Sequence, residues 1–103
     1  MALIQEIHSS NNQVSVTLAG SILVTDAAEL REKLLKYADK EGVQFHIDMQ
    51  RVEFIDSSGL GVLVTVLKRS RQKGGDVIIK GIHGVVKEVF ELTRLNRVFQ
   101  IQS

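Results

Sequence analysis

The sequence contains no cysteine, so it can form neither a disulfide framework nor a thiolate metal site. It also lacks a signal peptide and any apolar run long enough to cross a membrane. Its 13 basic and 12 acidic residues leave a net charge of +1, which does not indicate a nucleic acid, an acidic substrate or a membrane surface as a partner. These absences favour a cytoplasmic protein, and residues 1–103 are expected to form a single domain around one modest core.

Motifs for common enzyme classes are absent as well. The sequence has no G-x-S-x-G turn of a serine hydrolase and no G-x-x-x-x-G-K-[ST] loop for a nucleotide. His8, His46 and His83 are isolated and lack the spacing of metal ligands. The basic residues between 68 and 73 suit the last turn of a helix, and no aromatic residues are interleaved with them. We therefore expect no catalytic residue, no metal, no cofactor and no nucleic-acid partner.

Hydrophobic periodicity predicts an opening β-hairpin followed by alternating strands and helices. Apolar and polar side chains alternate through residues 14–18 and 43–49, as in half-buried strands. The element order predicts an α/β fold, a mixed sheet of about five strands with three to four helices packed on it. The expected strands are residues 3–8, 13–19, 43–55, 77–79 and 98–101, and the expected helices are residues 26–41, 57–73 and 86–91.

The first helix has a recognisable start signal. Residues Ser21 to Thr25 are expected to form a loop, with Asp26 as the N-cap and Glu29 as its capping-box partner. Glu29 and Lys33 are spaced as a favourable pair on a solvated helix face. Gly42 is expected to end the helix.

The chain is organised around residues 47–66, where a strand ends at a short polar run and an apolar helix follows. The side-chain oxygens of Asp56, Ser57 and Ser58 can each accept an orphan N–H group of a first helical turn. A serine hydroxyl at a helix start also suits a phosphate. Capping alone would explain the same residue types.

Two glycines lie in the first turn of that helix. Gly59 and Gly61 remove side chains there, so the backbone could approach another surface closely. This arrangement would expose the serine hydroxyl beside bare backbone.

The run FIDSSGLGVLV, with the preceding IDMQRV, resembles the signature of STAS domains, in particular the bacterial anti-sigma-factor antagonists. The segment GGDVIIKGIHGVVKEVFELTRLNRVFQI resembles the second half of the same family, so the resemblance covers nearly the whole chain. It implies the STAS fold. In these proteins a partner kinase phosphorylates the first serine of the D-S-S/T-G-L-G run, which makes Ser57 the implied phosphoacceptor.

The resemblance also implies a regulatory, non-enzymatic function. The unphosphorylated form would bind a serine protein kinase that is also an ATP-binding anti-sigma factor, and this would release the sigma factor. Phosphorylation would abolish the binding, a phosphatase would reverse it, and the protein would be a monomer or weak dimer. The implied site comprises a phosphosite loop of Asp56, Ser58 and Gly59 around Ser57, and partner contacts from Ser21, Leu23, Thr25, Leu60 and Gly61.

Two departures from the family pattern bear on these expectations. The family often has an acidic residue in a G-x-L-D run beside the phosphorylation site. The corresponding run here is Gly20-Ser21-Ile22-Leu23, and the first acid is Asp26. The family also tends to have glycine where this chain has Arg94.

Other interpretations stay open at this point. Some STAS domains are fixed subunits of phospholipid-transport ABC complexes, and others are parts of signalling scaffolds. Ser57 could be an unmodified cap or turn residue, and Ser58 is favoured as a helix cap over a second phosphosite. Asp56 could orient the Ser57 hydroxyl or assist a partner's Mg²⁺, or it could only stabilise the turn.

Overall fold

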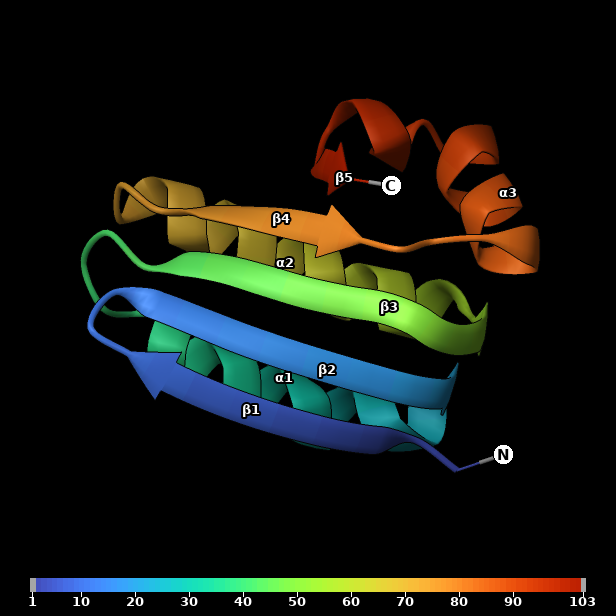
Figure 1. Ribbon diagram of the computed structural model, residues 1–103, viewed down its shortest axis with the longest axis horizontal. Helices are drawn as coiled ribbons and strands as arrows, with labels where there is room; N and C mark the ends of the chain where they lie inside the picture. Colours follow the sequence, from blue (N-terminus) through green and yellow to red (C-terminus); the bar gives the residue numbers. More distant parts are fainter. Residues whose placement is uncertain (1, 103) are drawn as a thin grey trace.

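The computed structural model describes residues 2–102, which form one five-stranded sheet (Figure 1). The strands lie in chain order across the sheet. The first two pair antiparallel and all later pairs are parallel, as the predicted hairpin and crossovers require. The strands are β1 (Ile4–Ser10), β2 (Gln13–Ile22), β3 (Gln44–Ile55), β4 (Asp76–Lys80) and β5 (Gln100–Gln102).

Three α-helices connect the parallel strands: α1 (Val24–Ala38), α2 (Ser57–Gln72) and α3 (Gly84–Leu92). Helices α1 and α2 pack against each other on one face of the sheet (Figure 1). Helix α3 lies beyond the carboxyl end of β4 and is followed by the 3₁₀ turn η1 (Leu95–Arg97). The N-termini of α1 and α2 therefore meet where β2 and β3 end.

The core lies between the sheet and these two helices. Alternate residues of β2, β3 and β4 are buried on that face, whereas most of their neighbours on the other face are polar and are exposed or half-buried. Each fully buried aliphatic side chain contributes about 1.5–3 kcal/mol, so this layer holds both helices in place. Its largest members include Leu18, Leu30, Leu34, Phe45, Ile47, Met49, Leu63, Leu67 and Ile79.

The start of the first helix differs from the prediction. Strand β2 continues to Ile22, so residues 21–25 do not form a loop, and the N-cap of α1 is Leu23 instead of Asp26. Gly20, at φ +97°, does not end the strand. It lies at a register shift between β2 and β3, an irregularity that allows the strand to continue.

The end of the chain also differs. The last strand begins at Gln100 instead of residue 98, and the 3₁₀ turn η1 precedes it. Phe99 is buried against the ring of Phe90, 5.9 Å between ring centroids, so its apolar character reflects the core and not strand alternation. Short apolar runs do not distinguish these cases.

Candidate functional site

A single carboxylate holds the starts of both helices. Asp56 is the N-cap of α2, and its Oδ1 accepts a hydrogen bond from the Gly59 amide at 3.0 Å. Its Oδ2 accepts from the amide of Val24, the first residue of α1, at 2.9 Å. The Asp56 amide donates to the Ile22 carbonyl oxygen at 3.1 Å. The capping role matches the sequence prediction, whereas the bond to α1 was not foreseen.

The other acid of this end is also engaged locally. Asp26 is the third residue of α1, and its Oδ2 accepts from the Leu23 amide at 3.1 Å. The Asp26 amide donates back to the Leu23 carbonyl oxygen at 2.8 Å. The run from Gly20 to Leu23 carries no acid, and the first acid after it is directed to its own helix start.

Ser57 is the first residue of α2, and its side chain is exposed. Its hydroxyl makes no hydrogen bond with any residue between 2 and 102. The neighbouring Ser58 is half-buried and is not the helix cap, because Asp56 occupies that position. The hydroxyl of Ser57 is thus the accessible one in the polar run.

The two glycines of the first turn have different surroundings. A Cβ at Gly59 would lie 2.8 Å from Ile22 Cγ2 and 2.8 Å from Ile55 Cγ1, so this glycine lets α2 approach its own sheet. A Cβ at Gly61 would meet nothing within 4 Å. The bare backbone that the sequence suggested for contact with another surface is therefore available at Gly61 and not at Gly59.

The other predicted contact residues are exposed to different degrees. Thr25 is exposed, whereas Ser21 and Leu23 are half-buried. Leu60 is only 9% exposed, so its side chain belongs to the core and is not available to a partner. Instead, the apolar residue Val24, which the sequence pattern had placed in a loop, is 65% exposed and lies beside Asp56.

A shallow hollow of about 430 Å³ lies between α1 and α2 next to this end. It is lined by Val24, Ala27, Ala28, Arg31, Ser58, Gly61, Val62 and Thr65. Sequence reasoning did not single out Arg31, because one arginine on an amphipathic helix resembles any solvated charge.

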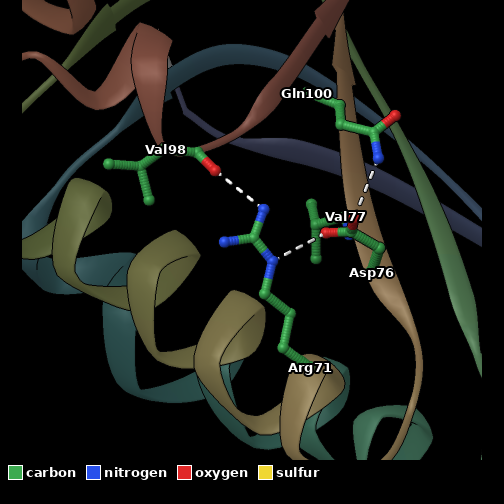
Figure 2. Close-up of polar contacts among 5 residues, drawn as sticks. All are labelled: Arg71, Asp76, Val77, Val98 and Gln100. Atoms are coloured by element: carbon green, nitrogen blue, oxygen red, sulfur yellow. Dashed lines mark hydrogen bonds and ion pairs between the residues drawn. The ribbon is translucent and has the colours of Figure 1, made fainter.

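The opposite end of α2 is closed by a polar network (Figure 2). Arg71 donates from Nε to Asp76 Oδ1 at 3.1 Å and from Nη2 to the Val98 carbonyl oxygen at 2.8 Å. Gln100 donates from its amide nitrogen to Asp76 Oδ2 at 2.9 Å. Arg71, one residue of the basic cluster, therefore anchors the segment that leads into the short strand β5.

The structure adds two further observations on the described chain. Residues 2–102 contain no group of three or more His, Asp or Glu side chains that could hold a metal ion. Within the same range, no helix is both long and apolar enough to cross a membrane.

Comparisons with known proteins agree with this architecture. The family model described as "STAS domain" matches residues 5–103. The anti-sigma-B factor antagonist of Listeria monocytogenes is 32% identical over 89% of this chain and 81% of its own length. The structure of SpoIIAA in its unphosphorylated form superimposes with a TM-score of 0.85, at 18% identity, covering 97% of this chain and 88% of that one.

A second solved structure carries a modification. SpoIIAA, described as a Bacillus cell fate determinant, in its phosphorylated form matches with a TM-score of 0.79 at 17% identity, covering 97% of this chain and 91% of that one. Matches at this identity establish the shared fold. With nearly all of its residues covered by the family model, the chain belongs to the STAS domain family.

Proposed function

We propose that this protein is an anti-sigma factor antagonist that works by partner switching, with Ser57 as the phosphoacceptor. The observation that carries the proposal is the position of Ser57, exposed at the first residue of α2 with a free hydroxyl. The name of the Listeria relative and the phosphorylated form of SpoIIAA support it.

In the unmodified state, the end of the molecule around Ser57 binds an anti-sigma factor that is also a serine kinase. That binding frees the sigma factor. The partner supplies ATP and the catalytic residues, so the protein itself contributes no catalytic residue. It acts in the cytoplasm. Thr25, Val24 and the exposed backbone at Gly61 provide contacts from both helices.

The modification transfers the γ-phosphoryl group of ATP to Ser57. The Ser57 Oγ forms a bond to the γ-phosphorus, the bond to ADP breaks, and the hydroxyl proton passes to a base of the kinase. A phosphatase later hydrolyses the phosphoserine to serine and inorganic phosphate. Asp56 positions the acceptor by holding the helix start, because both of its oxygens accept backbone hydrogen bonds.

The phosphate releases the partner without unfolding the domain. It adds about 1.5–2 negative charges at pH 7. At an exposed helix N-terminus such a charge stabilises by about 0.3–1 kcal/mol. Repulsion and the cost of desolvating the phosphate therefore act at the interface. A melting temperature that falls sharply on phosphorylation of Ser57 would contradict this account.

The test is retention of partners from a lysate of the native host. The protein and its Ser57→Asp and Ser57→Ala variants are immobilised and incubated with lysate and MgADP. We expect a small ATP-binding kinase on the unmodified protein and on Ser57→Ala, but not on Ser57→Asp. A Thr17→Asp variant adds the same charge on the exposed sheet face and should retain the kinase.

Two results would contradict the proposal. Equal retention of a transporter ATPase by all variants would indicate a fixed structural subunit. Retention of other STAS domains in a large assembly would indicate a scaffold component. Phosphopeptide mass spectrometry of the protein from its host tests the acceptor directly, since Ser57 should carry the phosphate.

A further inference from the structure

The hollow between α1 and α2 is open to solvent, and polar and apolar atoms line it in nearly equal parts. Several of its lining residues are small, and a Cβ at one of them, Gly61, would meet nothing within 4 Å. Val24, which also lines it, is 65% exposed. The exposed apolar side chain of Val24, beside the accessible Ser57, suits contact with a protein partner better than contact with water.

Arg31 is the single charged residue that lines this hollow. It is exposed and makes no ion pair with any residue of the described range 2–102. Three acids of this region are already engaged. Asp26 and Asp56 accept backbone amides, and Asp39 pairs with Arg69. Glu32, the next residue in the chain, forms no ion pair with Arg31, so the guanidinium is unpaired among residues 2–102.

Arg31 also lines a second hollow of about 420 Å³ farther along α1, with Ala28, Glu32, Leu35, Lys36 and Asp39. Two positive and two negative residues line that hollow, so it has no net charge. The arginine thus lies where the two hollows join. The hollow nearer Ser57 contains no carboxylate among its lining residues.

The hollow is continuous with the surface proposed to bind the kinase. Val24 is linked to Asp56 through its amide, and Ser58 follows the acceptor serine directly. An occupant of the hollow would therefore touch the same end of the molecule as a kinase acting on Ser57.

We infer that this hollow is a second part of the partner surface, which takes an apolar side chain and a carboxylate of the anti-sigma factor. The carboxylate pairs with Arg31, whose planar fork suits two parallel hydrogen bonds. The inference rests on the proposed function and names the chemistry of its partner.

The same pairing adds to the effect of phosphorylation. A phosphate on Ser57 would stand beside a surface that receives a negatively charged group. It would repel the partner's carboxylate and compete with it for Arg31. Binding of the unmodified form is thereby favoured at two points of one interface.

Photo-crosslinking tests where the partner lies. Benzoylphenylalanine is placed at Ala28 and Thr65 in the hollow, at Thr25 beside Ser57, and at Thr17 on the opposite sheet face. Each variant is irradiated in host lysate with MgADP. We expect one adduct, of the same partner, from positions 25, 28 and 65, and none from position 17. The adduct should be lost when Ser57→Asp is added.

The outcomes separate the two proposals. An adduct from position 25 without one from 28 or 65 would overturn the role of the hollow and leave the switch intact. If no position gives an adduct that is lost with Ser57→Asp, the proposed switch is overturned, and the inference falls with it.

A charge reversal then tests the carboxylate, with the cross-linked kinase as purified ligand. Arg31→Glu should weaken binding by at least about tenfold, and Arg31→Lys should recover part of the loss. Lys80→Glu makes the same charge change on the exposed sheet face and should leave the affinity unchanged. Unchanged affinity of Arg31→Glu, with a normal melting curve, would overturn the pairing.

Discussion

The two ends of α2 are built in opposite ways. At the carboxyl end, Arg69, Arg71 and Lys73 pair with Asp39, Asp76 and Glu41, so three of the four basic residues between 68 and 73 have a partner within the chain. At the amino end, the acids are directed to backbone amides and the side chains that face solvent have no partner within residues 2–102. The side chains at the carboxyl end mostly pair within the chain, whereas those at the amino end are available to a second molecule.

The difference shows how one helix can serve stability and recognition together. The buried middle of α2, with Leu63, Val66 and Leu67, holds both ends at fixed positions. The network around Arg71 stabilises the last strand, while the amino end is held by backbone hydrogen bonds that do not involve the Ser57 hydroxyl. Substitutions at the two ends should therefore have distinct signatures.

The largest effect is expected from glycines that mark close backbone approaches. In Gly75→Ala the new Cβ would overlap the Val43 carbonyl oxygen, and we expect a loss of about 3 kcal/mol in the free energy of unfolding. Gly59→Ala meets side-chain carbons at 2.8 Å and should cost about 1–3 kcal/mol. Urea denaturation measures both.

Gly61→Ala is the matched control for these two variants. With nothing within 4 Å, the added methyl should stabilise the helix by up to about 1 kcal/mol. Equal stabilities of Gly59→Ala and Gly61→Ala would contradict the packing role of Gly59.

The next largest effect is expected at Asp56, the cap that the two helices share. Asp56→Ala leaves the amides of Gly59 and Val24 without their acceptor, so the free energy of unfolding should fall by about 1–2 kcal/mol. Asp56→Asn keeps one acceptor oxygen and should lose less. Asp26→Ala removes one such bond and should cost about 0.5–1 kcal/mol. If Asp56→Ala cost no more than Asp26→Ala, the link between the two helices would add nothing.

The network at the other end should have a smaller, local effect. The Arg71 side chain is 44% exposed, so solvent screens its pair with Asp76, and Arg71→Ala should cost about 0.5–1 kcal/mol. Amide hydrogen exchange should rise in β5, because the Val98 carbonyl loses its donor. Lys73→Ala, whose pair with Glu41 is 4.0 Å long, should change neither quantity measurably. Unchanged exchange in Arg71→Ala would argue against the anchoring role.

The smallest effect is a gain. Arg94 has φ +60°, a left-handed conformation that costs a side chain free energy. Arg94→Gly should therefore stabilise the fold by about 0.5 kcal/mol, after the added freedom of the unfolded chain is subtracted. Asn11→Gly, at φ 57°, should gain less because asparagine tolerates this region. Thermal melts compare the stabilities of the two variants. A lower melting temperature in Arg94→Gly would contradict the claim that the backbone at Arg94 is strained.

Much of this architecture was accessible from the sequence, because local patterns determine it. Alternation predicted the strands, and the polar run before an apolar helix predicted a cap among Asp56, Ser57 and Ser58, which the structure assigns to Asp56. The bond from Asp56 to Val24 spans 32 residues, so no local pattern could indicate it. Because of the sheet irregularity at Gly20, β2 continues to Ile22 and α1 starts at Val24, earlier than predicted. The exposed residues at this end therefore differ from those expected.

The site was predicted less completely for a related reason. Gly59 and Gly61 look alike in sequence, and only the direction of each Cα relative to the sheet distinguishes packing from exposure. Leu60 was predicted to contact a partner from its position beside Ser57, but its side chain turns into the core. Arg31 was not predicted as a site residue, because it lines a hollow with residues of α2 that are distant from it in the sequence.

The order of the strands has a consequence for synthesis of the chain on the ribosome. Each strand pairs with the one made before it, so contacts can form as the chain emerges, without waiting for distant segments. The residues that build the Ser57 end all precede α3 and β5. The end of the molecule that carries Ser57 could therefore assemble on a nascent chain before the last helix and strand exist.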